Sequence, residues 1–239
     1  MYLAEFSALA AALCWSCGGL FSTTPARTLG AVRFNRLRLI IVSLTLIVMS
    51  LFGGGWQTLN AEAFWVLSLS SIIGILIGDT LMFATLKRLG PRRTGIIFGL
   101  LSALCQAISL IIARPIMATG VDALSASALR VGISALALIA ILFFNRPKDR
   151  HLSTPLTGKL LIQTGVSGII GMALGVTFLL FALTEGEVGL VSTLSATSPI
   201  FILPILWIAT RERPASGAWV GAFLAVFGIA CIFLKMPLV

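Results

Sequence analysis

The chain has 239 residues, of which 58% are hydrophobic and 10% are charged, and its mean hydropathy is +1.07. No soluble domain needs so little polar surface, so the composition excludes a water-soluble protein and predicts an all-α, polytopic bundle in a lipid bilayer. The formal net charge is +9. The basic residues stand in short loops between apolar runs, as in the cytoplasmic loops of membrane proteins, so we expect no nucleic-acid partner.

Apolar runs of about 20 residues, the length that crosses a bilayer, predict eight transmembrane helices. In chain order they cover about residues 3–22, 37–53, 63–86, 95–114, 122–144, 160–184, 188–209 and 216–234. The seventh run contains Pro199 and Pro204. Because proline interrupts the hydrogen-bond ladder of a helix, we expect a kink in this span.

The basic residues also predict the orientation. Fourteen of the 17 Lys and Arg residues lie in or beside the loops that join spans 1–2, 3–4, 5–6 and 7–8, and the others are Arg114, Arg130 and Lys235. Since basic loops stay in the cytoplasm, both termini should face away from it. The expected location is multi-pass in the cell membrane, which in bacteria is the inner membrane.

A stretch of the third span recurs in the sixth. Residues 70–94 read SSIIGILIGDTLMFATLKRLGPRRT, and residues 167–191 read SGIIGMALGVTFLLFALTEGEVGLV. Both copies keep a Gly-xxx-Gly pair, typical of close helix packing, and a Thr two residues later. The shared positions include Ser70, Gly74, Gly78 and Thr80, which recur as Ser167, Gly171, Gly175 and Thr177.

Shorter matches extend this repeat to the neighbouring spans. Ala12-Leu13-Cys14 recurs as Ala103-Leu104-Cys105, and Leu37-Arg38 recurs as Leu129-Arg130. Spans 1–3 therefore correspond to spans 4–6. Counterparts lie an odd number of spans apart, which makes the repeat inverted. We divide the chain into a first repeat of three helices, residues 1–94, and a second repeat of five helices, residues 95–239.

Taken in order, these features resemble the EamA-type branch of the drug/metabolite transporter superfamily, over nearly the whole chain. The matching features are A-L-C-W in the first span, the Arg near the start of the second and fifth spans, G-P-R-R-T after the third span, Ser198-Pro199, the turn at Arg211–Arg213, and a final helix with Gly217, Gly221 and Gly228. Members of that family have two five-helix repeats. The resemblance implies that this chain lacks the fourth and fifth helices of its first repeat.

The resemblance also implies a function. Such proteins move small molecules through a central cavity, so we expect a permease that carries a small metabolite or amphipathic compound by alternating access, with no cofactor. The alternative is a truncated, non-transporting paralogue that only inserts in the membrane. The sequence contains no nucleophile–base pair, metal-ligand spacing or phosphate loop, so we expect neither an enzyme nor a metal site.

Asp79 is the most informative single residue. A charge inside a span usually faces a cavity or pairs with a cation, and it marks an ion or substrate path. The second copy has Val176 at this place, so the repeat itself does not require an acid. The alternative is an Asp shallow enough to reach headgroup water. Arg38 and Arg130 are the nearest candidate cations. They either contact a substrate anion or a gate, or extend to the membrane interface.

Further polar and aromatic residues are candidates for the substrate or coupling-ion pathway. Gln106 in the second copy takes the place of Trp15, and one offers hydrogen bonds where the other offers an aromatic wall. Helix–helix hydrogen bonding is the alternative role for Gln106. A kink can leave carbonyl groups free to line a cavity. The remaining candidates are Ser16, Thr80, Thr177 and Pro199.

The missing helix pair has a structural consequence. Spans 7 and 8 are expected to pack on spans 4–6, which leaves the matching flank of spans 1 and 3 open to lipid. Polar groups exposed there would be costly in hydrocarbon. The chain can reduce that cost by collapsing or by forming a homodimer across the gap, and otherwise it is unstable.

The predicted orientation is open to a direct measurement. Reporter fusions after Leu152 should give a cytoplasmic signal, because the loop around that residue is basic, whereas fusions at the C-terminus should give an external signal. A cytoplasmic signal from the C-terminal fusion would contradict the predicted topology.

Overall fold

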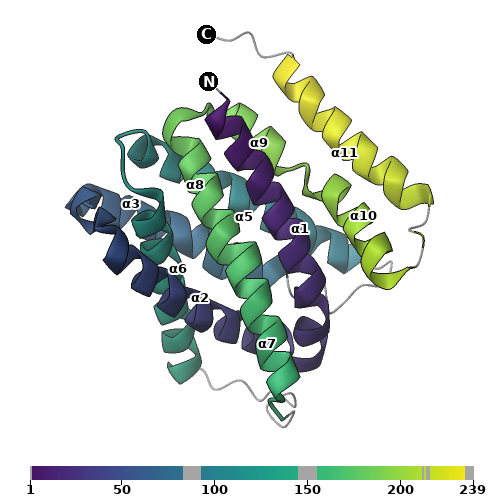
Figure 1. The fold of residues 1–239 in the computed structure, drawn as a ribbon, viewed down its shortest axis with the longest axis horizontal. Helices are drawn as coiled ribbons and strands as arrows, with labels where there is room; N and C mark the ends of the chain where they lie inside the picture. Colours follow the sequence, from purple (N-terminus) through teal and green to yellow (C-terminus); the bar gives the residue numbers. More distant parts are fainter. Residues whose placement is uncertain (1, 83–92, 145–154, 212, 214–215, 235–239) are drawn as a thin grey trace.

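The chain forms a bundle of helices, shown in Figure 1. A computed structural model describes residues 2–82, 93–144, 155–211, 213 and 216–234, in part by the backbone alone, as at 93–100, Pro199 and 228–234. Over these residues every regular element is helical. The elements are α1 Leu3–Leu29, α2 Ala31–Gly53, the 3-10 turn η1 Gly55–Thr58, α3 Ala61–Ser71, η2 Ile72–Asp79, α5 Arg93–Met117, α6 Ala123–Phe144, α7 Gly158–Ser167, η4 Gly168–Leu174, α8 Gly175–Glu185, α9 Val188–Ser195, α10 Ser198–Thr210 and α11 Ser216–Leu234.

These elements confirm the predicted polytopic all-α bundle of eight spans. α3 and η2 form one continuous helix, and so do α7, η4 and α8. Within the described ranges six helices are long and apolar enough to cross a membrane, and Leu101–Met117 of α5 is a shorter apolar helix. The loop between the third and fourth spans contains a basic cluster of Lys87, Arg88, Arg92 and Arg93. Its first three residues, and the predicted end of the third span at residue 86, lie outside the described residues, whereas Arg93 begins α5.

The first two spans are longer than predicted. The structure extends α1 from the predicted end at residue 22 to Leu29 and starts α2 at Ala31 instead of residue 37. The segment expected to be a basic loop is therefore helical on both sides of Gly30. Gly30 has φ 80°, a left-handed conformation that glycine adopts without steric cost. Polar residues end an apolar run but do not by themselves end a helix, which is why hydropathy placed these ends wrongly.

The seventh span is broken just before Pro199. α9 ends at Ser195 and α10 begins at Ser198, with a turn at Ala196 and Thr197 between them. Proline fits the first turn of a helix because its missing N–H has no partner to lose there. α10 continues through Pro204. Only the first of the two prolines thus coincides with an interruption of the helix.

The repeat predicted from sequence is visible in the backbone. η2 and η4 are both π-helices. η2 contains both glycines of its Gly-xxx-Gly pair, and η4 contains the first glycine of the matching pair. The helices that lead into them also start alike. Asn60 accepts a hydrogen bond from the Ala63 amide, and its counterpart Thr157 accepts one from the Leu160 amide. π-Helical turns are rare, so two of them at matching places support the repeat. Such turns also occur often at functional sites.

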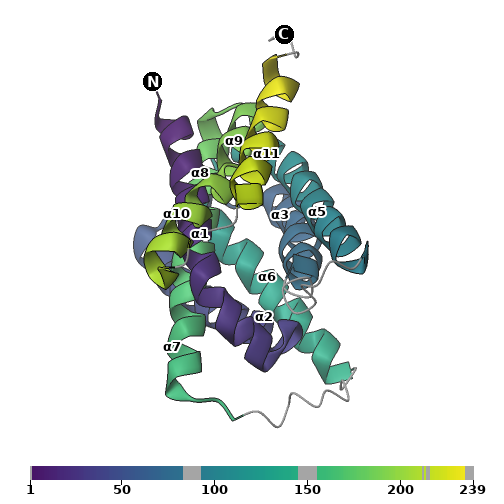
Figure 2. The same ribbon diagram turned by 90° about the vertical axis from the view of Figure 1, so that its right-hand side faces the viewer.

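Each copy contributes its first helix to the other copy. α1 packs along α7, η4 and α8, and α5 packs along α3 and η2, while α2 packs against α6 between these groups. Figure 1 shows α1 beside α8, and Figure 2 shows α3 beside α5. The recurring serines bridge the same interfaces, because Ser70 bonds to Ser109 of α5 and Ser167 bonds to Ser22 of α1. The two copies are therefore interlocked.

Small residues make this interlocking close. A methyl group on Gly171 of η4 would come 3.0 Å from the Cα of Gly18 in α1, so the two backbones are in contact there. At the matching crossing, a methyl group on Gly74 of η2 would collide with the hydroxyl group of Ser109 in α5. Helices in lipid associate through such van der Waals packing, since lipid tails offer no hydrophobic gain.

The last helices lie differently from the expected arrangement. α9 and α10 pack mainly against α1 of the first copy, with fewer contacts to α5 and α8, and α11 contacts α9 and α10 (Figure 1). The expectation that α1 is left open is therefore wrong, because α9 and α10 cover it. In the described part of α5, an apolar stripe is exposed, made up of Leu101, Leu104, Ile108 and Ile111.

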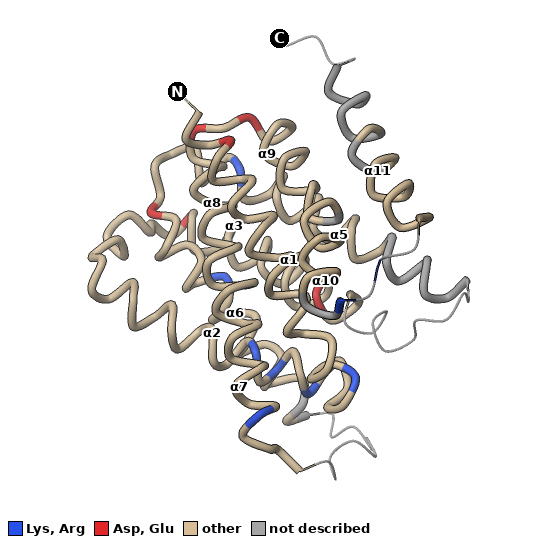
Figure 3. The backbone as a smooth tube through the Cα atoms, turned by 45° about the vertical axis from the view of Figure 1, so that its right-hand side comes forward, with Lys and Arg blue, Asp and Glu red and all other residues tan. Residues whose placement is uncertain are grey.

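Charges separate along the length of the bundle. Figure 3 shows most of the described acidic residues near the end that carries the N-terminus, and most of the described basic residues toward the opposite end, around α7. The loops at the two ends thus differ in charge, as the predicted orientation requires. The side that faces the cytoplasm stays a prediction.

The backbone contact at Gly18 and Gly171 should be sensitive to one methyl group. We expect Gly171→Ala to lower the free energy of unfolding by about 1–3 kcal/mol, because the added atom forces α1 away from η4. Gly165→Ala is the matched control, since nothing lies within 4 Å of a methyl group there. Denaturant unfolding of the purified protein in detergent micelles measures both. Equal stability of the two variants would contradict the close crossing.

Candidate functional site

A buried carboxylate links three helices at the end of η2. Asp79 is 8% exposed, and its Oδ2 accepts a hydrogen bond from Arg38 Nη2 of α2 at 2.5 Å. Its Oδ1 accepts a hydrogen bond from Gln106 Nε2 of α5 at 2.9 Å. Asp79 therefore lies inside the bundle, which favours the paired charge over an Asp that reaches headgroup water. Of the two cations that the sequence offered, Arg38 is the one that pairs with it.

Asn35 supports this pair, although the sequence did not single it out. It is fully buried in α2, and its Oδ1 accepts a hydrogen bond from Arg38 Nη2 at 3.2 Å. Its Nδ2 donates to Thr80 Oγ1 at 3.1 Å, which ties the residue after Asp79 to the same helix. Its spacing from Arg38 could have indicated it, because residues three apart lie on one face of a helix.

Arg130 occupies the matching place in the second copy. It is 2% exposed, and its Nη2 donates to Ser109 Oγ at 2.8 Å. Its Nε, also buried, has no hydrogen-bond partner among the described residues. Arg38 is likewise only 6% exposed. Both guanidinium groups lie inside the bundle, on residues about two turns after the starts of α2 and α6. This burial favours a role inside the bundle over the alternative of arginines at the membrane interface.

The other predicted residues lie elsewhere. Trp15 faces Gly175, where a methyl group would meet its indole ring. Ser16 donates hydrogen bonds to the carbonyl groups of Ala12 and Ser198, which ties α1 to α10. Thr177 donates to the Ala173 carbonyl of its own helix at 2.7 Å. The side chain of Pro199 lies outside the described part. The structure thus brings together Asp79, Thr80, Gln106 and Arg38, with Arg130 bound to the adjoining serines.

The cluster is charged and polar, and its charged side chains are almost inaccessible to solvent. Removing an ion pair from water is costly, and the mutual attraction offsets that cost only where further hydrogen bonds complete the geometry. Gln106 and Asn35 supply those bonds. Arg38, Asp79, Asn35 and Thr80 come from the first copy, and Gln106 comes from the second. The ion pair therefore lies at the interface of the two copies, where a relative movement would change its bonding.

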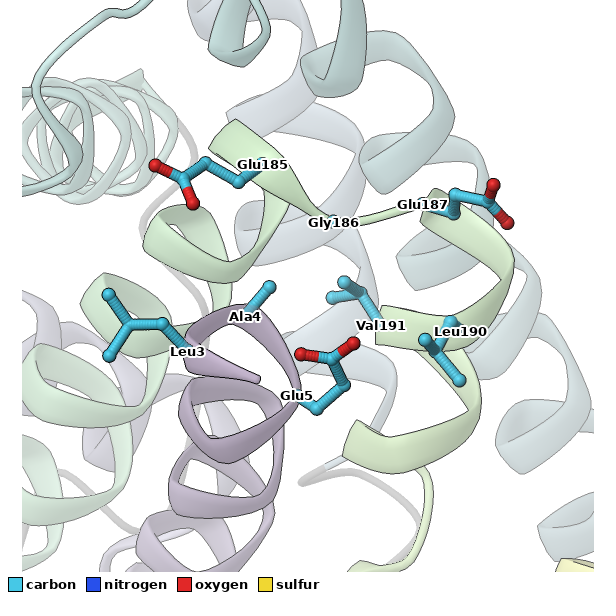
Figure 4. A pocket seen from close by; sticks show the side chains of 8 residues that line it. All are labelled: Leu3, Ala4, Glu5, Glu185, Gly186, Glu187, Leu190 and Val191. Atoms are coloured by element: carbon cyan, nitrogen blue, oxygen red, sulfur yellow. The ribbon is translucent and has the colours of Figure 1, made fainter. Parts of the chain in front are cut away.

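A separate pocket of about 380 Å³ lies at the end of the bundle (Figure 4). The first turn of α1 and the connection from α8 to α9 form its wall, with Glu5, Glu185 and Glu187 among the lining residues. Glu5 points toward the pocket, and its Oε2 has no hydrogen-bond partner in the part of the chain that the structure describes. This pocket shares no residue with the Asp79 cluster.

The Arg38–Asp79 pair should show energetic coupling. We expect Arg38→Gln and Asp79→Asn each to lower the free energy of unfolding by about 3–5 kcal/mol, because each leaves a buried charge without its partner. The double variant should lose less than the sum, by about 1–3 kcal/mol. Unfolding in detergent micelles measures the cycle, and Glu62→Gln, on the exposed start of α3, is the control. Additive losses would contradict the pairing.

The family of the chain follows from comparison with known proteins. A sequence model of the EamA-like transporter family matches residues 2–98 and 93–234, which together span nearly the whole chain. Searches of curated proteins and of solved structures found no match. The family match agrees with the eight-span bundle and with the resemblance in the ordered motifs. The chain belongs to the EamA-like transporter family, whose members are multi-pass membrane transporters of small compounds and not enzymes.

Proposed function

We propose that this protein is a permease that moves a small metabolite or amphipathic compound by alternating access, with Asp79 as the coupling group. The observation that carries the proposal is the buried ion pair of Asp79 with Arg38, bonded to Gln106 at the interface of the two copies. Ionisable residues inside a membrane are costly and usually mark substrate or ion paths. Transporters built from inverted repeats place their sites at such an interface.

The proposal assigns the repeat boundaries as well. Residues 1–94 are the first copy and residues 95–239 the second. The two segments that match the family model, 2–98 and 93–234, support this division. The matching π-helices and the exchange of α1 and α5 between the copies support it too. In alternating access, one copy moves against the other around a site between them.

Asp79 is suited to couple that movement to a proton. Its carboxylate is bonded by Arg38 of its own copy and by Gln106 of the other. Protonation removes the charge that both donors bind, which weakens the contact between the copies at this point. The simplest coupling ion is therefore a proton, carried when Asp79 releases and regains its partners. Thr80, held by Asn35, moves with the same segment of the helix.

The alternative is a non-transporting paralogue that only inserts in the membrane. One observation favours it. α1 is covered by α9 and α10, whereas the stripe on α5 of Leu101, Leu104, Ile108 and Ile111 is exposed. In α1, Ser16 contacts Ser198, but its counterpart Ala107 in α5 is exposed. The missing helix pair would cover this stripe. The exposed residues are apolar, so lipid can cover them, and a homodimer is not required for that purpose.

Transport by reconstituted protein distinguishes these proposals. The purified chain in proteoliposomes is offered labelled amino acids, carboxylates, sugars and amphipathic amines, with and without a pH gradient. We expect flux of at least one compound that depends on the gradient. Asp79→Asn should reduce it about tenfold or more, since a charge-assisted hydrogen bond is worth about 1.5–3 kcal/mol.

Two controls make the result decisive. Glu62→Gln removes an exposed acid from the same continuous helix and should leave flux unchanged. Wild-type protein that is folded and inserted, yet moves none of the compounds, would overturn the permease proposal in favour of the non-transporting paralogue. Wild-type flux that Asp79→Asn leaves intact at every pH would overturn the role of Asp79 alone.

A further inference from the structure

The buried cluster contains more positive than negative charge. Arg38 and Arg130 are both nearly inaccessible to solvent, and Asp79 is the one carboxylate buried beside them among the described residues. Asp79 binds Arg38 directly. Arg130 instead donates to the neutral hydroxyl group of Ser109. One carboxylate cannot neutralise two guanidinium groups, so one positive charge is left inside a low-dielectric bundle.

The repeat shows which partner Arg130 lacks. Arg38 and Arg130 are counterparts, and the counterpart of Asp79 is Val176, a buried apolar residue of α8. α8 packs against α6, the helix that carries Arg130. In the first copy the guanidinium has a carboxylate from the third helix, whereas in the second copy no described side chain supplies one at the matching place. The buried Nε of Arg130 is without a hydrogen-bond partner in the described part of the chain.

We infer that the transported solute carries a carboxylate, which binds Arg130 and fills the role in the second copy that Asp79 has in the first. This inference rests on the proposed function and narrows its substrate class to small monocarboxylates. The Nε and a terminal nitrogen of a guanidinium present two parallel donors that match the two oxygens of one carboxylate. The single negative charge of a carboxylate also balances the charge of the cluster. A phosphate monoester would bring more negative charge than the cluster needs, and a spherical halide would not match the shape of the two donors.

The repeat also indicates a second donor for that carboxylate. Gln106 donates to Asp79 in the first half of the site, and Trp15 is its counterpart, with its indole nitrogen beside Gly175. Gly175 directly precedes Val176. An indole N–H can donate to an anion but cannot accept from it. By this correspondence the second half of the site is expected to offer a guanidinium and an N–H donor, and the counterpart of Asp79 there is the apolar Val176.

Binding to the purified full-length chain in detergent tests this inference without requiring transport. The probes are sodium L-lactate, pyruvate and benzoate, each compared with its uncharged amide and with chloride and phosphate at equal ionic strength. We expect at least one carboxylate to raise the thermal unfolding midpoint, because a ligand that binds the folded state stabilises it. Its amide, chloride and phosphate should have no comparable effect. Equal shifts with chloride or phosphate, or no shift with any carboxylate, would overturn the inference.

Variants locate the binding to Arg130. Arg130→Lys keeps the charge without the forked donors and should weaken binding about tenfold, as for one lost charge-assisted hydrogen bond. Val176→Asp supplies a carboxylate from the chain itself and should abolish the shift while stabilising the protein without ligand. Arg114→Gln changes a basic residue of α5 outside the cluster and should bind normally. Unchanged binding by both Arg130→Lys and Val176→Asp would overturn the assignment.

The outcome separates this inference from the proposed function. Gradient-dependent flux of only neutral or cationic compounds, together with no carboxylate binding, would overturn the carboxylate site and leave the permease intact. Carboxylate binding without flux of any compound would support the site and overturn the permease. Loss of carboxylate flux in Val176→Asp, with normal insertion in the membrane, would support both.

Discussion

The bundle depends on the contact of each copy's first helix with the third helix of the other copy. At Gly18 and Gly171 the backbones of α1 and η4 touch, and at Gly74 and Ser109 the same crossing recurs between η2 and α5. No hydrophobic gain drives helices together in lipid, so close packing and interhelical hydrogen bonds have to supply the stability. Small residues and serines provide both. Because the first helix of each copy packs on the other copy, neither copy forms this interface alone.

That crossing also brings the charges together. η2 ends at Asp79, α2 carries Arg38 and Asn35, and α5 brings Gln106 within hydrogen-bond distance. A buried ion pair adds little net stability by itself, but removal of either partner is expensive. The pair thus constrains how α2, η2 and α5 can lie relative to one another. The π-helix η2 leads directly to this pair, and π-helical turns occur often at functional sites.

The two halves of the cluster are alike in backbone and different in charge. Arg38 and Arg130 correspond, as do Asp79 and Val176, and Gln106 and Trp15. In the first half the guanidinium of Arg38 is paired with Asp79, while in the second half Arg130 donates to the hydroxyl group of Ser109 and the counterpart of the acid is apolar. The outer surfaces of the two copies also differ, since α9 and α10 cover α1 whereas its counterpart α5 exposes an apolar stripe. Lipid tolerates such a stripe because its residues carry no polar groups.

The sequence by itself determined the class of fold, the eight spans and the repeat, and it singled out Asp79 as a charge inside a span. These follow from hydropathy, from the period of the Gly-xxx-Gly stretches and from the cost of a charge in a membrane, which are local properties of the chain. The ends of α1 and α2 did not follow, because helices continue through polar residues until a residue such as Gly30 changes the backbone direction. Only the tertiary structure decided that Asp79 pairs with Arg38 rather than Arg130, that Asn35 and Ser109 belong to the cluster, and that α9 and α10 cover α1. Partners from different helices are chosen by how the helices cross, and crossing geometry is not encoded in any one segment.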